Sequence, residues 1–112
     1  MAGFAHTSVL AAEVILALGP RDRGVYVDGT LGYAGHAREL LRAAPGATVI
    51  GIDRDPEAVS ASREVLAPFG DQARLIHGEY DELPRILAEL GVSRVDGILL
   101  DLGVSSPQLD VP

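Results

Sequence analysis

Residues 25–36 read Val25-Tyr-Val-Asp-Gly-Thr-Leu-Gly-Tyr-Ala-Gly-His36, and the rest of the chain is arranged around them. Strand-forming residues run into Asp28, glycines follow at 29, 32 and 35, and apolar residues then recur at helical spacing. This pattern predicts a strand, a tight glycine turn and the start of a helix, as in nucleotide-binding α/β folds. N–H groups at such a helix start favour an anionic ligand group, but an ordinary strand-to-helix turn with glycines for tightness would have the same pattern.

Strand and helix patterns alternate through the remainder of the chain. Short apolar runs predict strands at 24–28, 47–52, 73–76 and 95–100. A helix before the first strand is expected to end at Gly19. Among the later helices, one is expected to start at Asp55 and Pro56 and another at Asp81.

This alternation predicts an α/β protein with a Rossmann-like fold, in which a parallel sheet has the strand order 3-2-1-4. We expect one domain, with residues 1–23 as a helical lead-in and residues 24–112 as the alternating core. The expected sheet stops early, after its fourth strand. The chain therefore corresponds to the cofactor-binding half of such a domain.

Composition excludes several classes of protein. The 112 residues carry a net charge of −7, and all nine basic residues are arginines spread along the sequence, so no basic patch for nucleic acid is expected. The chain has no cysteine, which excludes disulfides and fits a cytoplasmic protein. Its N-terminal apolar run is short and contains Glu13, so neither a signal peptide nor a membrane span is expected.

Acidic residues follow the first two strands. Asp53 lies 18 residues after Gly35, a spacing that suits a carboxylate accepting hydrogen bonds from ribose hydroxyls. Asp53 could instead cap the next helix, but Asp55 stands beside Pro56 and suits that purpose better. Asp28 could bind either the N–H groups of the turn or a ligand ammonium.

Polar residues also follow the third and fourth strands. Tyr80 could stack on an adenine or could simply pack at the start of a helix. Asp101 and the hydroxyls of Ser105 and Ser106 are expected at the switch point of the sheet, although Ser105-Ser106-Pro107 could also be only a turn. The three histidines are far apart in sequence, so no metal site is expected; His36 could donate to a ligand, and His6 and His77 are expected to make local hydrogen bonds.

The glycine spacing indicates which nucleotide is bound. Gly29-Thr-Leu-Gly-Tyr-Ala-Gly35 does not match the G-x-G-x-x-G of dinucleotide sites, which disfavours a nicotinamide-dependent dehydrogenase. An acid directly before the turn suits a ligand that carries an ammonium beside its carboxylate. The methionine end of S-adenosylmethionine has this chemistry. The spacing of the residues does not specify the ligand any further.

The whole chain resembles the front part of the RsmH (MraW) enzymes, which are S-adenosylmethionine-dependent methyltransferases acting on N4 of a decoding-region cytidine in 16S ribosomal RNA. The matching segments are His6-Thr-Ser-Val-Leu10, Asp28-Gly-Thr-Leu-Gly-Tyr-Ala-Gly-His36, Ile52-Asp-Arg-Asp-Pro56, His77-Gly78 and Gly97-Ile-Leu-Leu-Asp-Leu-Gly-Val-Ser-Ser-Pro-Gln-Leu109. The last segment is the most specific.

The resemblance implies a set of site residues. Those expected to bind S-adenosylmethionine are Ala34, Gly35, His36, Asp53, Tyr80, Asp101 and Gln108. A cytosine amine is a weak nucleophile, so catalysis would depend on positioning and on an oxygen that accepts its N–H. Asp101 is the candidate acceptor, with Ser105 or Ser106 behind it.

Two departures from the family pattern bear on these expectations. Ala34 stands where the family usually has glycine, which predicts either crowding of the ligand or a negative φ at this residue. Family members are also much longer, so the chain is expected to be a truncated form in which most of the RNA-binding surface is missing. The alternative is a non-catalytic, nucleoside-binding or structural half-fold that forms homodimers through an exposed sheet edge.

Overall fold

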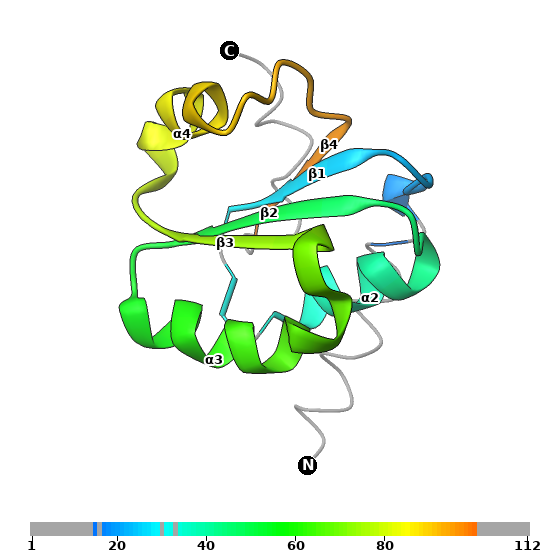
Figure 1. The fold of residues 1–112 in the computed structure, drawn as a ribbon, viewed down its shortest axis with the longest axis horizontal. Coiled ribbons are helices and arrows are strands. Elements are labelled where there is room, and N and C mark those ends of the chain that lie inside the picture. The colour runs from blue at the N-terminus through cyan, green and yellow to red at the C-terminus, as the bar shows by residue number, and fades with distance from the viewer. Residues whose placement is uncertain (1–14, 16, 30, 33, 101–112) are drawn as a thin grey trace.

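The fold is a parallel four-stranded sheet with helices on both faces (Figure 1). It is seen in a computed structural model that describes residues 15, 17–29, 31–32 and 34–100. The strands are β1 (Val25–Asp28), β2 (Thr48–Asp53), β3 (Ala73–His77) and β4 (Gly97–Leu99). Their order is β3-β2-β1-β4, which confirms the predicted order, although β4 is shorter than expected.

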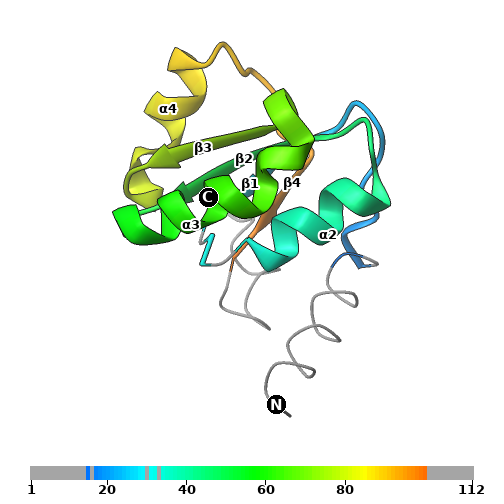
Figure 2. The same ribbon diagram turned by 60° about the horizontal axis from the view of Figure 1, so that its bottom comes forward.

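The helices lie on opposite faces of the sheet. Helices α2 (Gly35–Ala43) and α3 (Pro56–Leu66) cover one face, and α4 (Leu83–Glu89) covers the other, as Figure 2 shows from a second direction. Two short 3-10 turns, η1 (Ala67–Gln72) and η2 (Tyr80–Glu82), connect them to the strands. No helix in the described ranges is long and apolar enough to cross a membrane.

Each face of the sheet buries its own apolar cluster. The cluster beneath α2 and α3 includes Leu40, Leu41, Val49 and Leu66, which are at most 2% exposed. The cluster beneath α4 is formed by Val27, Ile50, Ile52, Leu83 and Ile86. Burial of each such side chain favours folding by about 1.5–3 kcal/mol. Residues from successive positions of β2 therefore enter opposite clusters, as expected of a strand buried on both faces.

The helix starts were predicted with mixed success. Asp55 caps α3 as expected, because its Oδ1 accepts a hydrogen bond of 2.9 Å from the Glu57 N–H, and Pro56 is the first helical residue. Asp81 does not cap the following helical segment. The turn η2 begins after Glu79 instead, and α4 continues from it, so the prediction for Asp81 was wrong.

The segment before β1 ends its helix at Gly19, as predicted. The Gly19 N–H donates to the Ile15 carbonyl at 3.0 Å, and Gly19 itself has a φ of +60°. Ile15 is 5% exposed and belongs to the cluster beneath α2. The beginning of this predicted helix lies outside the described residues.

Candidate functional site

The loop from β1 to α2 follows one of the two inner strands of the sheet. It contains two residues with left-handed backbone, Gly32 at φ +55° and Ala34 at φ +64°. Ala34 is held by its N–H, which donates to the Leu31 carbonyl at 2.7 Å, and by its carbonyl, which accepts from the Arg38 N–H at 2.9 Å. Of the two alternatives expected for Ala34, the negative φ is therefore excluded. Its methyl group is fully buried in the core cluster, which stabilises this conformation.

Helix α2 begins without a cap from any described side chain. Its N-cap residue is Ala34, and its first turn contains no acidic residue. Asp55 caps α3, and Glu79 and Glu82 bond each other at the start of η2, whereas η1 and α4, which continue directly from α3 and η2, have no side-chain cap. The first N–H groups of a helix have no partner within the helix and carry partial positive charge. The start of α2 can therefore accept a carboxylate or phosphate.

Asp53 faces this loop from the end of β2. Its Oδ2 accepts a hydrogen bond of 3.2 Å from the Gly32 N–H, and its Oδ1 accepts one of 2.9 Å from the Asp55 N–H. An ionised carboxylate has about four acceptor positions, so these two bonds leave capacity for ligand hydroxyls. Since Asp55 caps α3, Asp53 is not needed for that purpose, as the sequence indicated.

Ser62 supports the same loop from α3. Its hydroxyl is fully buried and donates to the Gly32 carbonyl at 3.3 Å. Asp53 and Ser62 thus hold the two backbone polar groups of Gly32 from two different elements. No role was assigned to Ser62 from the sequence. The signal in the sequence that could have indicated this role is a hydroxyl side chain among apolar positions of the helix.

The loop also rests directly on β2. A Cβ placed on Gly51 would lie 2.4 Å from Leu31 Cδ2 and 3.0 Å from Leu75 Cδ2. Leu31 is 4% exposed, so its side chain fills the space that the missing side chain of Gly51 leaves. Gly51 therefore sets the height of the loop above the sheet.

Tyr80 lies at the same end of the sheet and is 39% exposed. Its ring is close to Gly29, where an added Cβ would lie 3.0 Å from Tyr80 Cδ1 and 2.3 Å from Leu100 Cδ2. Gly29 thus allows the ring to approach the end of β1. The ring is accessible for stacking, and both alternatives for Tyr80 stay open.

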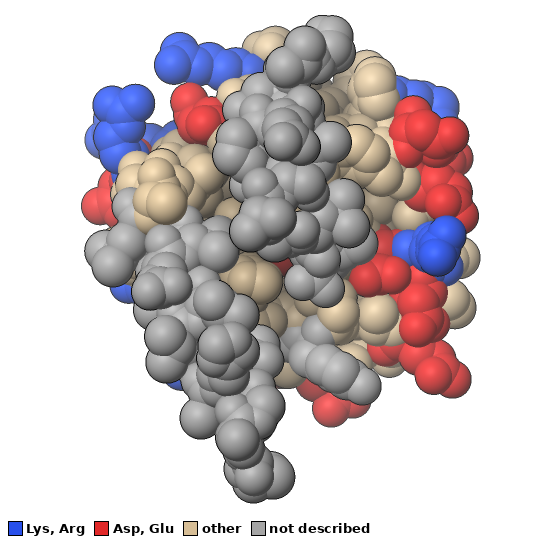
Figure 3. Space-filling view, turned by 180° about the vertical axis from the view of Figure 1, so that it is seen from behind, with Lys and Arg blue, Asp and Glu red and all other residues tan. Residues whose placement is uncertain are grey.

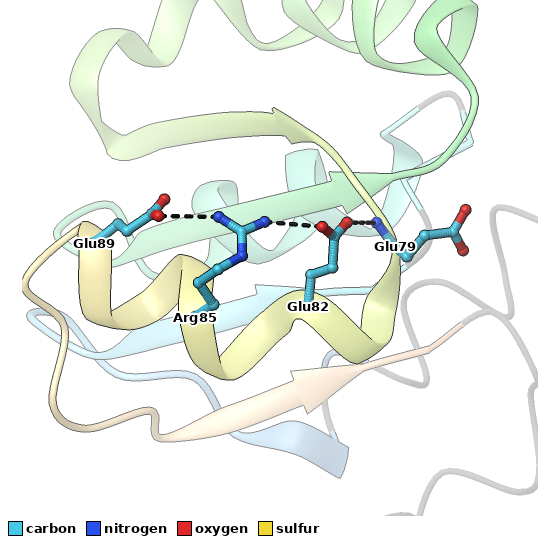
Figure 4. Close-up of polar contacts among 4 residues, drawn as sticks. All are labelled: Glu79, Glu82, Arg85 and Glu89. Carbon is cyan, nitrogen blue, oxygen red and sulfur yellow. Dashed lines mark hydrogen bonds and ion pairs between the residues drawn. The ribbon is translucent and has the colours of Figure 1, made fainter.

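Reciprocal bonds between Glu79 and Glu82 hold the turn that carries Tyr80 (Figure 4). The Glu79 N–H donates to Glu82 Oε1 at 2.8 Å, and the Glu79 carbonyl accepts from the Glu82 N–H at 3.0 Å. Arg85 then bridges Glu82 at 2.8 Å and Glu89 at 2.9 Å. The bond from Glu79 and the charge-assisted bond from Arg85 lower the pKa of Glu82. Its carboxylate consequently stays ionised, so the cap persists in mildly acidic solution.

The other predicted residues are distributed as follows. Asp28 is 2% exposed at the end of β1, opposite Gly51 and Leu99 in the two neighbouring strands. His36 lies in the first turn of α2 and is partly exposed. His77 bonds the Arg54 carbonyl at 2.9 Å, which confirms its expected local role. The predicted residues outside the described part of the chain are His6, Asp101, Ser105, Ser106 and Gln108.

The start of α2, Asp53 and Tyr80 form a candidate site at the carboxyl ends of the parallel strands. It combines an uncapped helix start, a carboxylate with unused acceptor capacity and an accessible aromatic ring. Such a set suits a ligand that has an anionic group, neighbouring hydroxyls and a flat ring. Gly35 adds room, because a Cβ at this position would meet no atom within 4 Å.

Comparison with known sequences gives a consistent result. Residues 3–112 match the MraW methylase family. The chain is 57% identical over 108 residues to "Ribosomal RNA small subunit methyltransferase H" of Geobacter sulfurreducens, covering 96% of this chain and 35% of that protein. It is 53% identical over 111 residues to the protein of the same name from Geotalea uraniireducens, covering 98% and 36%. The chain therefore spans about a third of the length of these curated relatives.

Comparison with solved structures supports the fold. TrmN from Thermus thermophilus matches with a TM-score of 0.69 and 24% identity, over 83% of this chain and 27% of that one. A precorrin-6y C5,15-methyltransferase from Geobacter metallireducens matches with a TM-score of 0.66 and 20% identity, over 80% and 46%. At these identities the likeness establishes a shared fold, the Rossmann-like fold of methyltransferases.

Proposed function

The chain belongs to the MraW methylase family, and from this membership we propose that it forms the S-adenosylmethionine-binding part of a methyltransferase that modifies N4 of a cytidine in the decoding region of 16S ribosomal RNA. The observation that carries the proposal is the placement of Asp53 opposite the uncapped start of α2, across the glycine loop. Relatives named for small-subunit ribosomal RNA support the substrate class. Such an enzyme would act in the cytoplasm, where this RNA is found.

Each part of the cofactor has a matching group in the site. Asp53 would accept hydrogen bonds from the ribose hydroxyls, and Tyr80 would stack on the adenine. The N–H groups at the start of α2, from Ala34 to His36, would bind the methionine carboxylate. The open space at Gly35 supports this contact, since a ligand can reach the backbone there. Asp101 and Gln108 would complete the pocket by their likeness to the family pattern.

The cofactor supplies a methyl group activated on a sulfonium. The chain's contribution to transfer is to hold the cytosine amine in line with that methyl and to accept a hydrogen bond from its N–H. We assign this acceptor role to Asp101, supported by Ser105 or Ser106. The pairing of Asp28 with Leu99 places the end of β4 beside the end of β1, so Asp101 follows a strand that borders the site.

An Asp101→Asn substitution tests the acceptor role. In a full-length enzyme of the family that carries this sequence, we expect the methylation rate to fall by about tenfold, the value of one hydrogen bond to a charged group. S-adenosylmethionine affinity should fall as well if Asp101 also contacts the cofactor. Single-turnover methylation of 30S subunits separates the two effects. A variant that methylates at the original rate would remove Asp101 from this role.

The cofactor proposal is tested by calorimetric titration of the 112-residue chain with S-adenosylmethionine, with NAD as the control ligand. We expect saturable binding of S-adenosylmethionine and none of NAD. A folded chain that binds neither would contradict the proposal. It would favour a structural half-fold that pairs through its outer strands, β3 and β4. Size-exclusion chromatography of the same samples, with and without cofactor, would detect such a homodimer.

A further inference from the structure

A second surface of interest lies at the opposite end of the sheet, where β1 and β4 begin. It is a groove of about 350 Å³ whose charged lining consists of Arg21, Asp22, Arg23, Arg94 and Asp96. Three of the nine arginines of an acidic chain therefore meet at one place. The sequence predicted no basic patch. The fold changes that expectation because β4 pairs with β1 and brings Arg94 beside the loop before β1.

The two acidic residues of this arginine groove are occupied by structural bonds. Asp22 Oδ1 accepts a hydrogen bond of 2.9 Å from the Gly46 N–H. Asp96 Oδ2 accepts one of 2.9 Å from the Val25 N–H, and its Oδ1 lies 3.3 Å from Arg94 Nε. Among the described residues, no carboxylate lies within 4.0 Å of the guanidinium groups of Arg21 or Arg23. These two exposed cations are therefore available to an external anion.

The backbone of the groove is rigidly built. Arg23 has a φ of +73°, which costs an L-residue about 1–2 kcal/mol compared with glycine. Its N–H donates to the Gly46 carbonyl at 3.0 Å, and the Gly24 N–H closes the turn on the Arg21 carbonyl at 3.0 Å. The Tyr26 hydroxyl, on a 3% exposed residue, accepts from the Arg21 N–H at 2.8 Å. Strain retained at an exposed arginine is the kind of outlier that points to a function.

The distribution of charge adds a further argument. Figure 3 shows basic side chains at the upper left of this face, whereas the right-hand side is mostly acidic with some basic side chains among the acidic ones. A polyanion approaching the molecule would therefore be oriented with its charge toward the arginine groove.

We propose that the arginine groove binds the phosphate backbone of the ribosomal RNA substrate, as a docking surface separate from the cofactor site. The proposal rests on the RNA substrate proposed above. Several guanidinium groups along one open groove suit a run of phosphates better than a single small anion, and arginine is well matched to phosphate geometry. Contacts of this kind position the RNA and carry no sequence information.

The test measures binding of the chain to a fluorescently labelled hairpin of decoding-region RNA, by anisotropy at several salt concentrations. Arg23→Asn removes the charge but keeps a residue that tolerates left-handed backbone. The double variant Arg21→Gln/Arg94→Gln removes the other two charges. Arg74→Gln, on the edge strand β3, is the matched control because Arg74 is exposed and lies outside the groove.

Each groove charge removed should weaken binding several-fold at low salt and reduce the slope of log affinity against log salt by about 1. Arg74→Gln should change neither quantity. Arg23→Asn should leave the free energy of unfolding equal to or above the original value, so that weaker binding cannot be ascribed to unfolding. Equal losses in the control, an unchanged slope, or no RNA binding by the unmodified chain would each overturn the proposal.

Titration of the same variants with S-adenosylmethionine keeps the two proposals separable. Cofactor affinity should be unchanged in all of them, because the groove lies at the other end of the strands. If the chain binds cofactor and the groove substitutions leave its RNA affinity unchanged, only the docking surface is disproved. Groove-dependent RNA binding without any cofactor binding would uphold the docking surface and disprove the cofactor site.

Discussion

Asp53→Ala is expected to weaken binding of S-adenosylmethionine by about 100-fold or more, because two hydrogen bonds from ribose hydroxyls to a carboxylate contribute about 1.5–3 kcal/mol each. The structure also attributes a local role to this carboxylate, which accepts the N–H groups of Gly32 and Asp55. Those N–H groups are near solvent and can bond water instead. We therefore expect only a small loss of stability, about 1 kcal/mol. Calorimetry measures the affinity, and urea unfolding measures the stability.

Asp55→Ala is the matched control for this prediction. It removes a carboxylate two residues away, together with the cap of α3, and should cost a similar amount of stability, about 1 kcal/mol. Its S-adenosylmethionine affinity should stay near the original value, because Asp55 faces the Glu57 N–H rather than the glycine loop. Equal losses of affinity in the two variants would mean that the loss results from general destabilisation of this end of the sheet. The ribose role of Asp53 would then be abandoned.

Gly51→Val is expected to destabilise the chain by about 2–3 kcal/mol and to weaken cofactor binding at the same time. The new Cβ would lie 2.4 Å from Leu31 Cδ2 and 2.9 Å from Leu31 Cγ, and the further methyl groups of valine increase the overlap. Leu31 is 4% exposed and has little room to move. The glycine loop must therefore rise from β2. Such a rise would shift the Gly32 N–H away from Asp53, in the candidate site.

A double-mutant cycle with Leu31→Ala tests the cause. Leu31→Ala alone should cost about 2–5 kcal/mol, since it removes a buried side chain. Combined with Gly51→Val, it leaves space that the valine can fill, so the two losses should sum to more than the loss in the double variant. Urea unfolding of the four proteins gives the coupling. Additive losses would show that Gly51 and Leu31 do not determine the loop position together.

Most of the architecture was predictable because it depends on local patterns. The run 47–52 is apolar apart from Thr48, as expected of a strand buried on both faces, and it corresponds to β2 (Thr48–Asp53). Asp55 followed by Pro56 predicted the start of α3, because a cap and a fixed φ act within one turn of chain. Alternation of strand and helix then limits the sheet to few orders, and the order 3-2-1-4 was confirmed.

Predictions failed where several neighbouring residues were equally suitable. Glu79, Asp81 and Glu82 all stand before the third helix, and any of them can cap. Glu79 is the N-cap of the short turn η2, because Glu79 and Glu82 each accept the backbone N–H of the other. At Ala34 the left-handed backbone excludes one of the two alternatives that the sequence left open. A buried methyl and two hydrogen bonds outweigh the intrinsic preference of alanine for negative φ.

Periodicity and glycine positions are properties of adjacent residues, and they were enough to predict the fold class and the strand order. The acid at the end of the second strand makes Asp53 a candidate site residue. Contacts between distant residues were decided by packing. Ser62 reaches the Gly32 carbonyl, Leu31 fills the space above Gly51, and Arg94 joins Arg23 in one groove only when helices and strands are assembled. Spacing along a chain does not specify such distances, because each depends on how several elements pack against one another.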